Sequence, residues 1–184
     1  MSVAKFSLQG KVALVTGGKS GIGRAIALGM AEAGADVAIC SRVLEDGELT
    51  GVAEEIQRLG RRSLAARADI SRRADVNNLV QAVINEFGSI DILVNNAGNY
   101  LRKPFLETSE EDWDSIINTH LKGYYYCCQA VGKIMVTRKK GNIINIASTL
   151  AHDPRPMVSA YAAAKSGILA MTRVMAMELA PYNI

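Results

Sequence analysis

Residues 11–23 read KVALVTGGKSGIG, and this stretch decides the fold. Residues 11–16 form a short run rich in β-branched side chains that stops at Gly17-Gly18, and residues 22–34 then carry apolar side chains at helical spacing. The pattern predicts a strand, a tight turn and a helix. Glycines at positions 17, 21 and 23 allow the turn to be tight and its backbone to lie against a ligand. Pyrophosphate at the N-terminus of the helix is the natural occupant of such a turn.

This glycine-rich turn has two other interpretations. It could serve only as a structural turn, or Gly18-Lys19-Ser20 could end the phosphate-binding loop of a nucleoside-triphosphate-binding protein. That loop requires a glycine five positions before its second glycine. Ala13 occupies this position, inside the expected strand, so the loop would be too short to wrap phosphates.

The alternation of strand and helix continues along the chain. Strands alternating with helices predict an α/β fold with a doubly wound parallel sheet, covered by helices on both faces in three layers. The chain has 184 residues, of which 49% are hydrophobic and 21% charged, and this suits one compact domain over residues 1–184. Further strands are expected at residues 36–41, 63–68, 90–95 and 142–147, and further helices at 45–60, 72–88, 109–140 and 159–180.

The helix at 109–140 carries a polar anomaly. Ser109 and Asp112 are spaced as a capping box at its start. Asn118 falls on the face expected to be buried, and a buried amide needs hydrogen-bond partners, although a satisfied core asparagine would be the default interpretation. The expected buried face comprises Trp113, Ile116, Ile117, Leu121, Tyr125, Cys128 and Val131.

Composition excludes several classes of partner. The formal net charge of +3 is small and scattered, so neither nucleic acid nor an anionic membrane is indicated as a partner. Residues 138–140 (RKK) are interpreted as cations that satisfy carbonyls in a last helical turn. The three cysteines show no metal-ligand spacing and no even disulfide count, so we expect no metal site and a reducing compartment. No stretch reaches the roughly 18 apolar residues that a membrane span needs, and a cytoplasmic location is expected.

The end of the chain resembles the start of another strand. Residues 183–184 follow the helix that Pro181 stops, and the apolar fifth strand would lie at the edge of the sheet. Because an uncovered apolar edge favours aggregation, we expect the sheet to continue in residues beyond Ile184.

The end of the second strand bears on the coenzyme. Roughly 20 residues beyond the glycines, an acidic residue would bind the ribose hydroxyls of NAD. Ser41-Arg42 stands there instead. A small hydroxyl leaves room for a 2′-phosphate and a guanidinium pairs with it, so NADP(H) is favoured. A solvated surface Arg42 is the alternative.

Tyr161 and Lys165 lie four residues apart near the start of the last helix and therefore share one face. This spacing is weak evidence by itself. An ammonium a few ångströms away favours the phenolate of a tyrosine, whose ordinary pKa near 10 makes it a poor base at neutral pH. Ser148 follows the fifth strand, at the sheet edge where ligands of open α/β folds bind, and its hydroxyl could hold a substrate oxygen.

Together these residues resemble the short-chain dehydrogenase/reductase family over essentially the whole chain, with bacterial 3-oxoacyl reductases and sugar or polyol dehydrogenases as the closest branches. Residues 16–23 (TGGKSGIG) resemble its cofactor motif TGxxxGxG, residues 95–98 its NNAG motif, and the Tyr161 and Lys165 spacing its active-site pair. Asn118 and Ser148 match the other two members of its catalytic tetrad.

The resemblance implies a Rossmann-like fold with strand order 3-2-1-4-5, then 6 and 7, assembled as a homotetramer or dimer. It implies that Tyr161 gives or takes the hydroxyl proton, that Lys165 binds the nicotinamide ribose and tunes Tyr161, and that Ser148 orients the carbonyl. Asn118 would position a water in a proton relay. Asp69 would hold the adenine end of the coenzyme, with Ile70 beside it. The expected coenzyme-binding residues are Gly17, Lys19, Ser20, Gly21, Ile22, Gly23, Ser41, Arg42, Asp69, Ile70, Asn95, Ala97, Gly98, Tyr161 and Lys165.

Two departures from the family pattern concern the coenzyme and the substrate. Lys19 stands one position earlier than the basic residue that many NADP-preferring members carry, so Arg42 bears most of the coenzyme prediction. The family's sixth strand, its substrate-covering helices and its seventh strand have no counterpart before Ile184. The predicted fold therefore stops after the fifth strand and the helix that follows it.

The predicted activity is hydride transfer between NADP(H), or alternatively NAD(H), and a ketone or secondary alcohol. A non-catalytic, cofactor-binding regulator is the alternative, and members of that kind usually lose the tyrosine or the lysine, both of which this chain keeps. The expected partners are a small carbonyl or alcohol substrate and further copies of the chain. The substrate pocket is expected to be lined by residues 100–105 and by His152, Asp153, Arg155 and Met157. Loop residues do not identify a molecule, so sugars, polyols, 3-oxoacyl thioesters and steroid-like ketones stay open as substrates.

Overall fold

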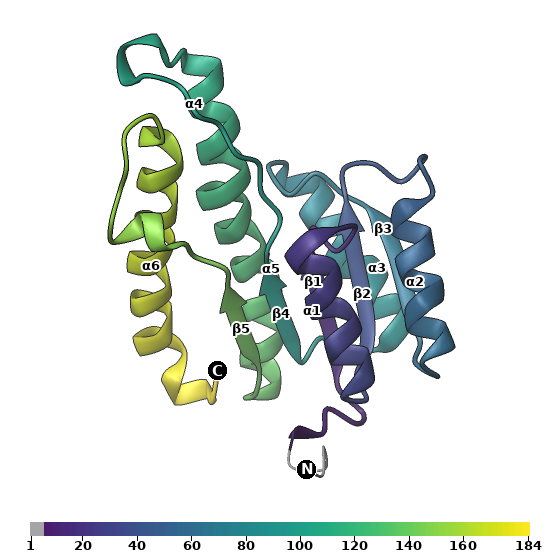
Figure 1. Cartoon of the computed structure of the whole chain (residues 1–184). Helices are drawn as coiled ribbons and strands as arrows, with labels where there is room; N and C mark the ends of the chain where they lie inside the picture. Colours follow the sequence, from purple (N-terminus) through teal and green to yellow (C-terminus); the bar gives the residue numbers. More distant parts are fainter. Residues whose placement is uncertain (1–5) are drawn as a thin grey trace.

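The sheet has five parallel strands in the order β3-β2-β1-β4-β5. This computed structural model describes residues 6–184 (Figure 1). The observed order confirms the order that the resemblance implied. The bounds follow the prediction closely, except that β4 begins later and β5 ends earlier. The strands are β1 (Val12–Thr16), β2 (Asp36–Ser41), β3 (Ser63–Arg67), β4 (Ile92–Asn95) and β5 (Asn142–Asn145).

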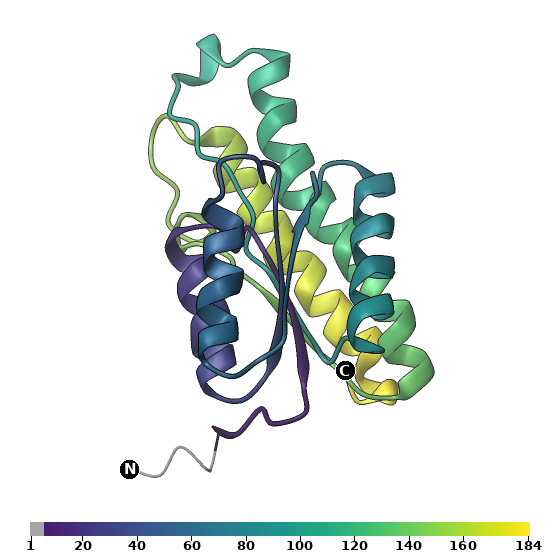
Figure 2. The ribbon, with the colours of Figure 1, turned by 90° about the vertical axis from the view of Figure 1, so that its right-hand side faces the viewer.

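Helices cover both faces of the sheet, which confirms the three-layer α/β fold. Figure 2 shows the two helical layers on either side of the strands. One layer holds α1 (Gly21–Glu32) and α2 (Glu48–Arg58); the other holds α3 (Arg73–Phe87), α5 (Gly123–Arg138) and α6 (Ser159–Leu179). The helix α4 (Glu110–Ile117) projects beyond the sheet (Figure 1). Short 3-10 turns occupy Phe105–Glu107, Thr149–Ala151 and Ala180–Tyr182.

The core lies on both faces of β1, whose residues are all buried. Ala13 and Val15 pack toward α1 and α2, while Val12 and Leu14 pack toward α3 and α5. A central parallel strand covered by helices needs apolar side chains on both faces, and this explains the unbroken hydrophobic run in the sequence. The edge strand β5 is only partly buried, and Ile144 is exposed.

The helix expected at 109–140 is divided by a π-turn. Its N-terminus has the predicted capping box, in which the Asp112 backbone N–H donates to Ser109 Oγ and the Asp112 carboxylate accepts from the Ser109 N–H. Residues Asn118–Lys122, labelled η3, then form a π-turn before α5 begins. The π-turn inserts an extra residue into a helical turn.

The core face of this helix agrees in part with the predicted face: Ile116, Cys128 and Val131 are buried as expected. Trp113 and Tyr125, both expected in the core, are 38% and 42% exposed. The other buried positions are Thr119, His120, Gly123, Tyr124, Cys127, Gly132 and Met135. The buried stripe from Ile116 to Met135 covers five turns in 19 residues rather than the 18 of a regular α-helix, and the π-turn contributes the extra residue.

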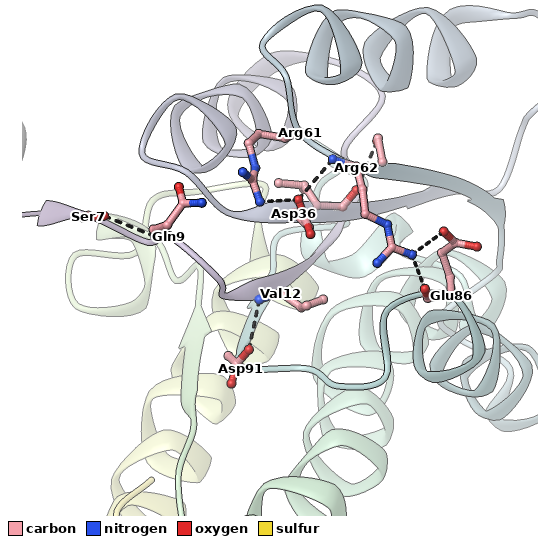
Figure 3. Close-up of polar contacts among 10 residues, drawn as sticks. Ser7, Gln9, Val12, Asp36, Arg61, Arg62, Glu86 and Asp91 are labelled. Carbon is pink, nitrogen blue, oxygen red and sulfur yellow. Dashed lines mark hydrogen bonds and ion pairs between the residues drawn. The ribbon is translucent and has the colours of Figure 1, made fainter.

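At the N-terminal ends of the strands, opposite the glycine turn, the carboxylates of Asp36 and Asp91 bind neighbouring segments of the chain (Figure 3). Asp36 accepts from Arg61 Nη2 at 2.6 Å and from the Arg62 N–H at 3.1 Å. Asp91 accepts from the Val12 N–H at 3.0 Å and from Arg138 Nη2 at 3.0 Å. Arg138 thus binds Asp91 and the Ile90 carbonyl rather than carbonyls of its own helix, which corrects the interpretation of the basic cluster.

The chain end does not begin a strand in this structure. Asn183 has a left-handed backbone, with φ of 58°, and follows the 3-10 turn at Ala180–Tyr182. Its carbonyl accepts from the Gly141 N–H at 3.3 Å, beside the start of β5. The expectation of an extended segment at 183–184 was therefore wrong.

Three predictions from composition concern the cysteines, membrane-spanning segments and metal sites. Cys40, Cys127 and Cys128 are all buried and free. Within residues 6–184, no helix combines the length and the hydrophobicity needed to cross a bilayer. The same residues contain no cluster of three or more His, Cys, Asp or Glu side chains suited to a metal ion.

Candidate active site

The turn after β1 exposes backbone donors at the start of α1. Gly17 has φ of 67°, a left-handed conformation that glycine adopts without strain. Ser20 precedes the helix but makes no side-chain cap, so the first N–H groups of α1 have no side-chain acceptor. A Cβ at Gly23 would overlap the Gly17 carbonyl, so this close approach requires glycine. These free donors at a helix N-terminus suit a phosphate group.

The segment at 95–98 fixes this turn through Thr16. The Asn96 and Ala97 N–H groups donate to Thr16 Oγ1 at 3.0 and 3.1 Å. Asn96 Nδ2 lies 3.1 Å from the Thr16 carbonyl and 3.2 Å from the Gly17 carbonyl. The end of β4 therefore holds the end of β1 and the glycine turn in one arrangement.

A cavity of about 280 Å³ lies beside the turn, at the carboxyl ends of β1, β2 and β4. Its position and its polar lining fit the phosphate and ribose portions of a dinucleotide. Eight of the expected coenzyme-binding residues line it: Gly17, Lys19, Ser20, Ser41, Arg42, Ile70, Ala97 and Gly98. Four further lining residues were not predicted from the sequence: Cys40, Ala68, Asn96 and Thr119.

Five further expected coenzyme-binding residues are not among those that line this cavity. Asn95 is fully buried, and its Nδ2 donates to Asn145 Oδ1 at 2.9 Å, so it joins β4 to β5 instead of lining the cavity. Asp69 Oδ1 accepts from the Ser71 N–H and hydroxyl at 3.0 and 2.7 Å. Gly21, Ile22 and Gly23 form the first turn of α1 without lining the cavity.

Acidic side chains surround the cationic rim of the cavity. Lys19 forms ion pairs with Asp46 and with Glu48, the latter at 3.1 Å. Hydrogen bonds to Asp46 and then Glu48 raise the pKa of Lys19. The Arg42 guanidinium has no ion pair within the described residues, although its carbonyl accepts from Arg67 Nε at 3.1 Å. Arg42 is therefore the cation at this rim that is available to an incoming anion.

Tyr161 and Lys165 lie on one face of α6. Lys165 is only 2% exposed, and its Nζ donates to the Ile146 carbonyl, 2.5 Å away at the end of β5. The Lys165 Nζ lies 5.6 Å from the centroid of the Tyr161 ring. Burial lowers the pKa of Lys165 to about 8. Its ammonium is thus held beside the phenol in a poorly solvated position, where a charge acts strongly on its neighbours.

Ser148 stands between β5 and α6. It precedes the 3-10 turn at Thr149–Ala151, and its Oγ accepts from the Leu150 N–H at 3.2 Å. Ser166 of α6 donates to the Ala151 carbonyl at 3.0 Å and holds this turn against the helix. The hydroxyl hydrogen of Ser148 stays available for another acceptor.

Asn118 lies in the π-turn, and His120 of the same turn packs against the tyrosine. Asn118 is half-buried and, among the described residues, makes no hydrogen bond with Tyr161, Lys165 or Ser148. The His120 ring is T-shaped against Tyr161, with 5.2 Å between ring centroids. Sequence reasoning missed His120, and the available signal was a second polar residue two positions along the same expected helix.

These features define a class of protein: a dinucleotide-binding α/β protein whose Tyr–Lys pair stands where the strands end. A family model described as short chain dehydrogenase matches residues 11–184. The chain is 43% identical to the 2-dehydro-3-deoxy-D-gluconate 5-dehydrogenase of Escherichia coli, over 100% of this chain and 72% of that protein. It is 38% identical to a 3-oxoacyl-[acyl-carrier-protein] reductase of Staphylococcus epidermidis, over 95% of this chain and 71% of that protein.

Solved structures agree with these sequence comparisons. A short-chain type dehydrogenase/reductase from Mycobacterium marinum superposes with a TM-score of 0.93 at 37% identity, over 100% of this chain and 75% of that one. An NAD⁺-bound xylitol dehydrogenase superposes with a TM-score of 0.91 at 32% identity, over 96% of this chain and 67% of that one. The chain belongs to the short-chain dehydrogenase/reductase family of NAD(P)-dependent oxidoreductases that act on alcohols and ketones.

Proposed function

We propose that this protein is an NADP(H)-dependent oxidoreductase that interconverts a ketone and a secondary alcohol, with Tyr161 as general acid and base. The observation that carries the proposal is the buried Lys165 ammonium, fixed by the Ile146 carbonyl and facing the Tyr161 ring. A nearby positive charge stabilises the phenolate form of a tyrosine relative to the neutral phenol. General acid–base catalysis is efficient when the side chain can both give and take a proton at the pH at which the enzyme works.

The residues of the site have separate tasks in this proposal. The nicotinamide coenzyme, when bound, supplies or accepts the hydride. The glycine turn binds the pyrophosphate, and Ser148 donates a hydrogen bond to the substrate oxygen. Tyr161 gives a proton to that oxygen during reduction and takes it back during oxidation, while Lys165 stabilises the phenolate. Asn118, in the π-turn, positions a water in the proton relay.

The coenzyme is NADP(H), because Ser41-Arg42 stands at the end of β2 where an acidic residue would favour NAD(H). Lys19 is paired with Asp46 and Glu48, so Arg42 is the cation that binds the 2′-phosphate. A fluorescence titration should give tighter binding of NADPH than of NADH. Arg42→Ala should weaken NADPH binding about 10-fold or more while leaving NADH nearly unchanged, given the strength of arginine–phosphate pairs. Arg58→Ala, on the exposed face of α2, is the matched control. Equal affinity of the wild type for both coenzymes would sink the role given to Arg42.

The substrate is a hydroxylated ketone of the sugar-acid or polyol type. Two relatives named 2-dehydro-3-deoxy-D-gluconate 5-dehydrogenase align with 100% of this chain at 43% and 40% identity. Oxidation or reduction of the nicotinamide should be followed by absorbance at 340 nm with sugar-acid ketones, polyols and 3-oxoacyl thioesters. Turnover fastest with the sugar-acid or polyol group supports the assignment; turnover restricted to 3-oxoacyl thioesters contradicts it.

The protein works as a cytoplasmic homo-oligomer, a tetramer or dimer, with residues 1–184 inside one catalytic domain. Its three free, buried thiols suit a reducing compartment. Light scattering on the purified protein tests the assembly, and a monomeric mass across the micromolar range would contradict it.

A further inference from the structure

His120 lies at the π-turn and touches the tyrosine of the proposed mechanism. Its side chain is buried, with 3% of the residue exposed. The Tyr161 ring has His120 at 5.2 Å and Tyr100 at 5.1 Å, both in T-shaped arrangements. Tyr161 is therefore held between two rings that come from different segments. T-shaped pairs are favourable beyond their buried area, so they restrict how the phenol can turn.

The shorter of two contacts at His120 Nε2 favours the Nε2–H tautomer, whereas the longer contact would need the Nδ1–H tautomer. Nε2 lies 2.7 Å from the Asn99 carbonyl oxygen, which can only accept, so Nε2 carries the proton and donates. In that tautomer the Asn99 N–H, which points at Nε2 from 3.2 Å, makes no hydrogen bond to it. This tautomer leaves Nδ1 as a bare acceptor, and Nδ1 is buried with no hydrogen-bond partner among the described residues.

Two residues near the His120 ring have donor hydrogens to spare. The Lys165 ammonium has three N–H groups, and within the described residues it makes one hydrogen bond, to the Ile146 carbonyl. Its charge acts on the His120 ring: burial first, and then Lys165, lower the pKa of His120 to about 4. The Tyr124 hydroxyl is also buried without a partner, and the Tyr124 ring lies 5.1 Å from Lys165 Nζ and 6.3 Å from the His120 ring.

Gly98 shows that the histidine is built into the site. A Cβ at position 98 would overlap the His120 ring, so the backbone of the 95–98 segment packs directly against it. The ring therefore connects the coenzyme cavity, which Gly98 lines, to the Tyr161 and Lys165 pair.

We propose that His120 is a positioning residue for the Tyr161 and Lys165 pair: its Nε2–H is anchored on the Asn99 carbonyl, and its Nδ1 accepts a hydrogen bond from the Lys165 ammonium through one water molecule. The bridge satisfies a buried acceptor that otherwise has no partner among the described residues, and it uses an N–H group that the Ile146 carbonyl leaves free. It fixes the ammonium at the distance from Tyr161 at which it favours the phenolate. This inference rests on the proposed function, because it assigns His120 through the chemistry of Tyr161.

The test compares three variants in the steady-state assay at 340 nm. His120→Phe keeps a ring against Tyr161 but makes no hydrogen bond, whereas His120→Asn keeps one donor and one acceptor. We expect His120→Phe to lower kcat about 10-fold or more, with KM for the coenzyme nearly unchanged, because a transition-state interaction is lost. Its pH profile should shift upward by about half a unit or more, since a loosened Lys165 favours the phenolate less. His120→Asn should recover most of both losses.

Failure of this inference is separable from failure of the proposed function. Tyr161→Phe is the third variant: full activity in it defeats the proposed function itself. An inactive Tyr161→Phe together with a folded His120→Phe of wild-type kcat and pH profile defeats only the role of His120. Failure of His120→Asn to improve on His120→Phe has the same meaning.

A measurement on the wild-type protein covers the case in which His120→Phe does not fold. In protein labelled with ¹⁵N-histidine, the ring-nitrogen chemical shifts of His120 at neutral pH should be those of the neutral Nε2–H tautomer. The Nδ1 shift should be that of a nitrogen that accepts a hydrogen bond. Lys165→Met should move this Nδ1 resonance toward that of a free acceptor. An Nδ1–H tautomer, or a resonance indifferent to Lys165→Met, would overturn the proposal.

Discussion

At the scale of single residues, the site depends on side chains that are buried where polar groups are costly. Lys165 is the clearest example, because burial lowers its pKa from 10.5 to about 8. The charged form is therefore disfavoured in the folded state. Between pH 8 and 10.5 the unfolded chain binds a proton that the folded chain does not, so the contribution of Lys165 to stability rises with pH in this window and is lost as pH falls.

The Lys165 shift can be measured by comparison with Lys165→Met. The free energy of unfolding of the wild type should gain about 3 kcal/mol relative to this variant between pH 8 and 10.5, at about 1.4 kcal/mol for each unit of pKa. Urea titrations at several pH values give the difference, and groups other than Lys165 cancel in it. A difference that is flat with pH would contradict the shift.

The contact between Gly98 and His120 gives a second prediction for single residues. Gly98→Ala places a methyl group against a buried ring and should cost about 1–3 kcal/mol of unfolding free energy. Gly29→Ala in α1 is the matched control: its Cβ would meet nothing within 4 Å, and a gain of up to about 1 kcal/mol is expected. In the Gly98→Ala, His120→Ala double variant the losses should be less than additive. Strict additivity would mean that the two residues do not touch.

At the scale of elements, most of the fold follows from hydrophobic patterns that local physics enforces. The buried run of β1 and the glycines after it predict a strand, a turn and a helix, and the capping box at Ser109 predicts where α4 begins. The π-turn was not predictable in this way. Its effect on the pattern is one extra residue in five turns, which is smaller than the scatter of an ordinary apolar stripe.

The positions of site residues were predictable where a sequence motif determines the backbone conformation. They were less predictable where tertiary packing determines which side chain contacts the site. The glycine turn and the Tyr161 and Lys165 pair lie where the sequence places them. His120, which no family motif pointed to, packs its ring against Tyr161 from the π-turn. Asn95 was expected at the coenzyme, but a fully buried residue at the end of β4 finds its partner in Asn145 of the next strand.

The junction of β1, β4 and α5 depends on Asp91, and this gives a prediction at the scale of elements. Asp91 is 6% exposed and accepts from both the Val12 N–H and Arg138. Asp91→Ala should lower the free energy of unfolding by about 2–4 kcal/mol, because a backbone donor and a guanidinium lose their acceptor. Arg138→Met, which keeps the Val12 hydrogen bond, should cost clearly less in the same urea titration. Equal costs would show that the Val12 hydrogen bond contributes nothing.

At the scale of the whole molecule, the reactivity of the three cysteine thiols measures whether the helices stay packed on both faces of the sheet. Cys40, Cys127 and Cys128 lie in the core, and burial raises the pKa of Cys40 and of Cys128 to about 12. Because the thiolate is the reactive form, none of the three should react with Ellman's reagent at pH 8 in the native protein, and all three should react in guanidinium. Rapid labelling of one thiol in the native protein would contradict the packing around it.

The central claim is that Tyr161 transfers the proton in a dehydrogenase built on this fold. The most direct measurement is the kcat of Tyr161→Phe on the fastest substrate found at 340 nm, with the affinity for NADPH measured by fluorescence in parallel. Loss of the hydroxyl should lower kcat about 10²- to 10⁴-fold and leave NADPH affinity within about threefold, because only the proton transfer is removed. Tyr182→Phe, 37% exposed near the chain end, should behave as the wild type. A Tyr161→Phe protein that keeps the wild-type kcat would contradict the account.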